Sequence, residues 1–253
     1  MGLRVPGSTG RWSRARRRRT LGDMTTTLIT GATRGLGHET ARRLVAAGHT
    51  VWIGARDPER GRAVAAGLGA RHVALDVLDD DSVAAAAATV AAAGGLDVLV
   101  NNAGIAGARR PVSETSPEDV RHVFETNVFG VVRVLQAFLP LLERSPAPVV
   151  VNVSSGMGSL AITTDPERLE SSLVGLAYPS SKAALNMLTA QYAKAYPALR
   201  INAVDPGYTS TEFNGHRGWK PVEQGADVIV RMASIGAGGP TGAYVDEDGP
   251  IPW

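Results

Sequence analysis

Short apolar runs alternate with longer amphipathic stretches along most of the chain. Strands that alternate with helices in this way predict a parallel sheet with helices on both faces. We therefore expect an α/β fold, a single-domain, Rossmann-like, doubly wound parallel sheet of about seven strands. The runs expected to form strands are 27–30, 50–54, 72–75, 96–101, 149–153, 200–204 and a short one near 243–245. The helical patterns cover 35–47, 58–68, 79–93, 117–143, 177–196 and a stretch near 221–234.

The first 23 residues are strongly basic, whereas the rest of the chain is slightly acidic. They hold seven arginines and one acid, Asp23, which leaves 19 basic and 23 acidic residues from totals of 26 and 24. Such an arm binds nucleic acid or anionic lipid in some proteins; in others it is a disordered extension, or it comes from an upstream start with Met24 as the natural one. We expect a disordered extension at 1–23, because a predicted strand begins directly after Met24. The acidic remainder, 24–253, argues against a nucleic-acid partner.

Composition excludes several kinds of chemistry. There is no cysteine, which excludes disulfides, thiol catalysis and thiolate metal sites. The five histidines lack the spacing of a metal site. No stretch approaches the ~18 apolar residues of a membrane span, and no apolar segment of a secretory signal follows the N-terminal arginines. We expect a cytoplasmic protein with no metal and no membrane partner.

The first predicted strand leads directly into a glycine-rich turn and then a helix. Glycines there let the backbone approach a pyrophosphate, and free N–H groups at a helix N-terminus attract an anion. A structural loop is the alternative, but the position after the first strand favours a dinucleotide site. The turn has the spacing G-x-x-x-G-x-G, and its candidate contacts are Gly31, Thr33, Arg34, Gly35, Leu36 and Gly37.

The end of the second predicted strand indicates which dinucleotide is bound. An acid there would hydrogen-bond the ribose 2′-hydroxyl of NAD(H), but the chain has Ala55 followed by Arg56. Arg34 lies in the glycine turn. Two arginines at these positions suit a 2′-phosphate, through charge-assisted and bidentate hydrogen bonds, unless both are ordinary solvated side chains. We expect NADP(H) as the cofactor, with NAD(H) the less favoured alternative.

Six sequence features, in order, carry a resemblance to a known family. They are the glycine turn, Asn101-Asn102-Ala103-Gly104, Asn127, Ser154-Ser155, Tyr178-Pro179-Ser180-Ser181-Lys182 and Pro206-Gly207. Their arrangement resembles the short-chain dehydrogenase/reductase family of the classical type, over essentially all of 25–250. The resemblance implies an oxidoreductase that moves a hydride between a nicotinamide and a carbonyl or secondary alcohol.

The pair Tyr178 and Lys182 suits acid–base chemistry. The two residues are i and i+4 on a predicted helix, so both project from one face. A free tyrosine has a pKa near ~10, and a neighbouring ammonium favours the phenolate, so we expect Lys182 to lower the pKa of Tyr178. Tyr178 would then exchange a proton with the substrate oxygen.

The resemblance implies roles for the other site residues. It implies that Lys182 also binds the nicotinamide ribose, that Ser155 rather than Ser154 hydrogen-bonds the substrate oxygen, and that Asn127 holds a proton-relaying water. The further cofactor contacts that it implies are Asp76 and Val77 at the adenine, Asn102, Ala103 and Gly104 at the ribose and adenine side, and Pro206, Gly207, Thr209 and Thr211 at the carboxamide.

The chain departs from the common family pattern in two loops. Between Ser155 and Tyr178 lie 22 residues, which resembles the carbonyl-reductase-like branch and leaves monomer and homo-oligomer both open. The region after Pro206-Gly207 is short, so we expect an open pocket with Phe213, Trp219 and the 156–176 loop on its rim, unless these residues pack on the body.

The favoured function is an NADP(H)-dependent reductase or dehydrogenase acting on a small carbonyl or alcohol. The alternative is a catalytically silent dinucleotide-binding regulator or scaffold on the same fold. Such a protein would be expected to lose Tyr178 or Lys182, and this chain has both.

Overall fold

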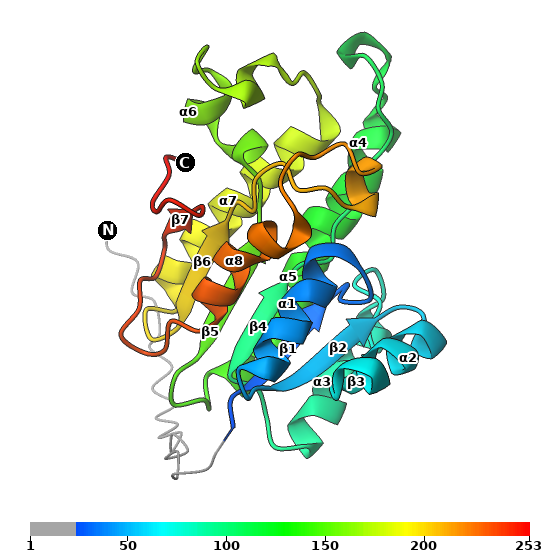
Figure 1. Ribbon diagram of the computed structural model, residues 1–253, viewed down its shortest axis with the longest axis vertical. Coiled ribbons are helices and arrows are strands. Elements are labelled where there is room, and N and C mark those ends of the chain that lie inside the picture. Colours follow the sequence, from blue (N-terminus) through cyan, green and yellow to red (C-terminus); the bar gives the residue numbers. More distant parts are fainter. Residues whose placement is uncertain (1–23) are drawn as a thin grey trace, which may run out of the picture.

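The computed structural model describes residues 24–253, and their strands form one parallel sheet (Figure 1). The sheet order is β3-β2-β1-β4-β5-β6-β7, which confirms the predicted fold class. The order reverses between β1 and β4, and in open α/β sheets the crevice at such a switch point is where ligands bind. The strands are β1 (Thr26–Thr30), β2 (Thr50–Ala55), β3 (Arg71–Ala74), β4 (Val98–Asn101), β5 (Val149–Val153), β6 (Arg200–Val204) and β7 (Tyr244–Val245). The predicted N-terminal extension, 1–23, lies outside the described residues.

The helices follow the expected pattern with one correction. The predicted helix 117–143 is helical from Pro117 to Leu142, but a π-helical turn, η2 (Glu125–Phe129), lies between its α-helical parts α4 (Pro117–Phe124) and α5 (Gly130–Leu142). Such turns accommodate an extra residue and are frequent at functional sites. The other helices are α1 (Gly35–Ala46), α2 (Pro58–Leu68), α3 (Asp80–Ala92), α6 (Leu160–Thr163), α7 (Ala177–Ala195) and α8 (Val222–Ala233), with 3-10 turns η1 (Val112–Glu114), η3 (Gly156–Gly158), η4 (Leu169–Ser172) and η5 (Glu212–Asn214).

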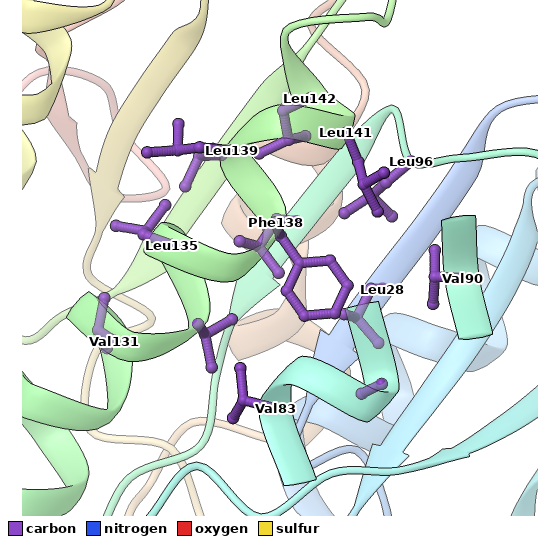
Figure 2. Packing of buried hydrophobic residues seen from close by; sticks show 14 of the residues in the cluster. Leu28, Val83, Val90, Leu96, Val131, Leu135, Phe138, Leu139, Leu141 and Leu142 are labelled. Atoms are coloured by element: carbon purple, nitrogen blue, oxygen red, sulfur yellow. The ribbon is translucent and has the colours of Figure 1, made fainter. Parts of the chain in front are cut away.

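Two apolar clusters cover the two faces of the sheet. One joins the strands to α3, α5 and α7, with the ring of Phe138 among the side chains of Leu28, Val83 and Val90 (Figure 2). The other joins them to α1, α2 and α8. By length and composition alone, Pro117–Leu142 is the one stretch of residues 24–253 that could span a membrane. Most of it is buried inside the fold, as expected of a core helix.

Phe138 is fully buried, so its loss is expected to destabilise the fold strongly. Phe138→Ala should lower the free energy of unfolding by about 3–5 kcal/mol, because it removes buried apolar surface and leaves a cavity. Urea unfolding followed by circular dichroism measures this. Met187→Ala, at an exposed position of α7, is the control, with an expected change within about 0.5 kcal/mol. Equal effects of the two substitutions would contradict the assigned core.

Candidate active site

A cleft of about 920 Å³ lies at the carboxyl ends of the strands, where the sheet order reverses. Figure 1 shows α6 and the loop before α4 rising beyond these strand ends. The cleft is therefore large enough for an extended ligand. Its lining includes every predicted cofactor contact and three of the four predicted catalytic residues: Gly31, Thr33, Arg34, Gly35, Leu36, Gly37, Arg56, Asp76, Val77, Asn102, Ala103, Gly104, Ser155, Tyr178, Lys182, Pro206, Gly207, Thr209 and Thr211.

The glycine turn leaves the N-terminus of α1 open to an anion. Gly31 has φ +64°, and a Cβ there would lie 3.0 Å from the Ala103 Cα, so only glycine fits. The N-cap residue of α1, Arg34, makes no side-chain capping bond, and the first turn holds no acid. Helices α2, α3 and α4 are instead capped by Asp57, Asp79 and Ser116. The uncapped N–H groups of α1 therefore suit the pyrophosphate of a dinucleotide.

Asn102 and Thr30 join the turn after β1 to the turn after β4. The Asn102 side-chain amide donates to the carbonyl oxygens of Thr30 (2.9 Å) and Gly31 (3.1 Å). The Thr30 hydroxyl in turn accepts from the backbone N–H groups of Asn102 and Ala103, both at 3.0 Å. These four bonds fix the two walls of the cleft at the switch point.

Three arginines line the end of the cleft at β2. Arg34, Arg56 and Arg60 all lie in the lining, are exposed, and form no ion pair within residues 24–253. Unpaired guanidinium groups in a cleft suit a phosphate monoester. The sequence analysis missed Arg60. Its spacing of four residues from Arg56, at the start of a predicted helix, was the available signal.

Ser155, Tyr178 and Lys182 meet at the other end of the cleft. The Ser155 hydroxyl lies close enough to the Tyr178 phenol to lower the pKa of that phenol, and the Lys182 Nζ lies 5.6 Å from the centre of the Tyr178 ring. Lys182 is buried and donates to the Val153 carbonyl oxygen at 2.8 Å. The Ser154 hydroxyl instead donates to the Asn186 side chain at 2.6 Å. Of the two serines, Ser155 is the one whose hydroxyl contacts Tyr178.

The expectation that Lys182 lowers the pKa of Tyr178 is wrong for this structure. Burial raises the pKa of the Tyr178 phenol, and the nearby Ser155 hydroxyl offsets only part of this. Burial lowers the pKa of Lys182 to about 8, while the Asp205 carboxylate acts in the opposite sense. Desolvation disfavours the charged form of each group, and here it outweighs the neighbouring charge. The phenol is therefore protonated at neutral pH.

Asn127 is fully buried and does not line the cleft. Its side chain accepts from the Ile105 N–H (2.9 Å) and donates to the Ile105 carbonyl oxygen (2.9 Å) and the Ser181 hydroxyl (3.0 Å). These contacts hold the loop after β4 against α7, and Asn127 makes them from within the π-helical turn. The role in holding a water stays a prediction.

Of the acids in the cleft lining that were not predicted from the sequence, Asp205 and Glu170 act on one another. Asp205 directly follows β6, and Glu170 lies in the long loop between Ser155 and Tyr178. Burial and the charge of Glu170 both raise the pKa of Asp205, against the hydrogen bond from the Gly207 N–H. The only signal in the sequence was an acid placed directly before Pro206-Gly207.

The rim differs from the prediction at one residue. Phe213 lines the cleft, with its ring centre 5.6 Å from that of Tyr178. Trp219 does not line it and packs edge-on against Tyr208 at 5.2 Å. The 156–176 loop contributes apolar side chains to the lining: Met157, Leu169, Leu173, Val174 and Leu176.

Comparisons with known proteins agree with this fold and cleft. A family model described as short chain dehydrogenase matches residues 25–220. The chain is 37% identical over 224 residues to the short-chain dehydrogenase anuI of Penicillium roqueforti, covering 83% of this chain and 88% of that protein. It is 32% identical over 300 residues to the (−)-isopiperitenone reductase of Mentha piperita, covering 87% and 96%. The solved structure of an NADPH-bound carbonyl reductase from chicken fatty liver matches with a TM-score of 0.80 at 28% identity, covering 91% and 99%.

The chain belongs to the short-chain dehydrogenase family of oxidoreductases. The similar structure with NADPH bound supports a nicotinamide dinucleotide as its cofactor, and the cleft has the features that such a ligand requires. These are a helix N-terminus for the pyrophosphate and three unpaired arginines at one end.

Proposed function

We propose that this protein is an NADP(H)-dependent reductase of carbonyl compounds, with Tyr178 as the general acid. The observation that carries the proposal is the convergence of Ser155, Tyr178 and Lys182 at one end of a cleft whose other end holds unpaired arginines. When bound, the nicotinamide supplies the hydride. The name of the similar solved structure, an NADPH-bound carbonyl reductase, points in the same direction.

The side chains at the catalytic end divide the work. Tyr178, protonated because it is buried, donates its proton to the carbonyl oxygen as negative charge develops there. The Ser155 hydroxyl donates to the same oxygen and stabilises that charge. Lys182 holds the nicotinamide ribose with its ammonium group. The uncharged phenol favours reduction, and alcohol oxidation by the same site requires Tyr178 to lose its proton first.

The opposite end of the cleft selects the cofactor. We propose that Arg34, Arg56 and Arg60 bind the 2′-phosphate of NADP(H). Three unpaired cations suit an anionic phosphate, whereas the 2′-hydroxyl of NAD(H) carries no charge. Asp76 and Val77 contact the adenine. Along the cleft, the remaining contacts proposed are Gly31, Thr33, Gly35, Leu36 and Gly37 at the pyrophosphate, Asn102, Ala103 and Gly104 at the ribose, and Pro206, Gly207, Thr209 and Thr211 at the carboxamide.

The substrate wall of the cleft is apolar. Leu173, Val174 and Leu176 from the long loop, with Phe213 opposite, give the carbonyl compound an apolar surface to pack against. We therefore propose aromatic or alicyclic ketones and aldehydes as substrates. The name of the isopiperitenone reductase agrees with a small organic substrate. We also propose that the protein acts in the cytoplasm on a small molecule, without a nucleic-acid or membrane partner.

A panel of carbonyl compounds tests this function. Purified protein with NADPH should consume the cofactor, measured by the loss of nicotinamide absorbance, with at least one aromatic or alicyclic member. Small aliphatic ketones are the comparison and should give lower kcat/KM, because they cannot fill the apolar wall. NADPH binding without turnover of any member would favour the alternative of a silent dinucleotide-binding regulator.

A further inference from the structure

Asp205 is a buried acid beside the proposed catalytic side chains. Only 6% of its surface is exposed, and it lines the cleft directly after β6. Its backbone N–H donates to the Val245 carbonyl oxygen at 2.8 Å, so its position is set by the sheet. A buried carboxylate requires hydrogen bonds or a partner charge to offset its desolvation.

The carboxyl group of Asp205 contacts two different turns. Its Oδ1 accepts from the Gly207 N–H at 2.9 Å, in the turn after β6. Its Oδ2 lies beside Gly156, the residue that follows Ser155 after β5, and a Cβ added to Gly156 would be 3.0 Å from it. On the neighbouring strand β7, the Tyr244 hydroxyl donates to the Ser155 carbonyl oxygen at 2.5 Å. One side chain thus sets the spacing between the proposed catalytic serine and the proposed carboxamide contact.

Glu170 brings a second negative charge to the same point. A Cβ on Gly156 would lie 2.8 Å from the Glu170 Oε1 and 3.0 Å from the Asp205 Oδ2, so only a glycine leaves room for the two carboxyl groups. Asp205 interacts electrostatically with titratable groups on three elements and in the segment after β7. They are Tyr178 and Lys182 on α7, Glu170 on η4, Tyr244 on β7 and Asp246 after it.

We propose that Asp205 is a positioning residue for the reductase reaction: it joins the Ser155 and Gly207 turns, and its carboxylate acts electrostatically on Lys182 and Tyr178. The inference rests on the proposed function. The charge of Asp205 raises the pKa of both groups, and for Lys182 it opposes the effect of burial. Burial and Glu170 raise the pKa of Asp205 against the hydrogen bond from the Gly207 N–H, so Asp205 acts on the two groups only above its raised pKa.

Asp205→Asn tests both parts, because the amide keeps the shape but loses the charge and one acceptor. We expect kcat/KM for carbonyl reduction to fall by about 10- to 100-fold, as for other displacements of a reacting group. The alkaline limb of its pH profile should move to lower pH by about 1 unit, since both pKa values fall without the carboxylate. A loss of rate with an unmoved limb would mean a structural role only and overturn the inference.

Glu170→Gln is a second variant. Glu170 is only half-buried, so its substitution disturbs folding less than that of the buried Asp205. Removing this like charge lowers the pKa of Asp205, so the acidic limb should move to lower pH and the rate above it should persist. Glu167→Gln, an exposed acid of the same loop outside the cleft lining, is the matched control and should leave both limbs in place. An acidic limb that does not move in Glu170→Gln counts against Asp205 as its source.

The binding of NADPH gives a readout that does not depend on turnover. Since the pKa of Lys182 is about 8, the dissociation constant measured by nicotinamide fluorescence should rise as the pH passes that value. In Asp205→Asn this rise should begin about 1 pH unit lower. An unchanged titration overturns the inference even where carbonyl reduction is established. A shifted titration in a protein that reduces no carbonyl would support the electrostatic role of Asp205 and reject the proposed function.

Discussion

Tyr178→Phe should lower kcat/KM for carbonyl reduction by at least about 100-fold, while NADPH still binds with nearly unchanged affinity. General acid catalysis contributes about 10²- to 10⁴-fold, and the substitution removes the acidic proton while keeping the ring. The ring packs against Phe213, and that contact survives in the variant. Steady-state rates with the best substrate of the panel, together with NADPH fluorescence titrations, measure the two quantities.

Tyr192→Phe is the matched control for this experiment. Tyr192 lies on the same helix, stacks on Tyr196 at 6.2 Å and packs against the apolar cluster, as expected for a packing residue. Its loss should leave kcat/KM within about twofold, which is a change of less than about 0.5 kcal/mol. Normal turnover by Tyr178→Phe would reject Tyr178 as the acid, and loss of NADPH binding would show that the residue acts on the cofactor instead.

Arg56→Asp should weaken NADPH binding by about 100-fold and leave NADH binding nearly unchanged. The substitution removes a charge-assisted bond to the 2′-phosphate and adds a repulsive carboxylate directly after Ala55, the position where NAD-dependent enzymes of this fold hold their ribose acid. Dissociation constants for both cofactors, measured at one ionic strength because such contacts are screened by salt, give the comparison.

Arg62→Asp is the control for the change of charge. Arg62 lies on α2, is exposed and does not line the cleft, so both cofactors should bind as before. Arg60→Ala should resemble Arg56→Asp with a smaller effect, since it removes a cation without adding an acid. Equal loss of NADPH and NADH in Arg56→Asp would reject the 2′-phosphate site.

The sequence predicts the sheet well because each strand is a short apolar run between polar turns. The predicted 149–153 and 200–204 agree with β5 and β6 at both ends, whereas β4 begins at Val98 rather than at residue 96. The π-helical turn within 117–143 was not predictable from periodicity. It contains Asn127, which bonds to Ile105, 22 residues away in the chain.

The candidate site was predictable where a role depends on local spacing. Tyr178 and Lys182 are one helical turn apart, and the glycine turn follows the first strand. Both features can therefore be recognised from short stretches of the sequence. Asp205 and Glu170 meet only because the long loop folds back over the end of β6, which no local pattern records. The raised pKa of Tyr178 likewise depends on burial by distant segments rather than on the neighbouring lysine.

The account depends on hydride transfer from a nicotinamide to a carbonyl carbon in this cleft. The most direct measurement is reduction of the best carbonyl substrate with NADPH in which both C4 hydrogens of the nicotinamide are deuterium, followed by mass spectrometry of the product. We predict an alcohol that carries one deuterium on the former carbonyl carbon, formed by Tyr178→Phe at least about 100-fold more slowly than by the wild type. A product without deuterium, or equal rates of labelled-product formation by the two proteins, would contradict it.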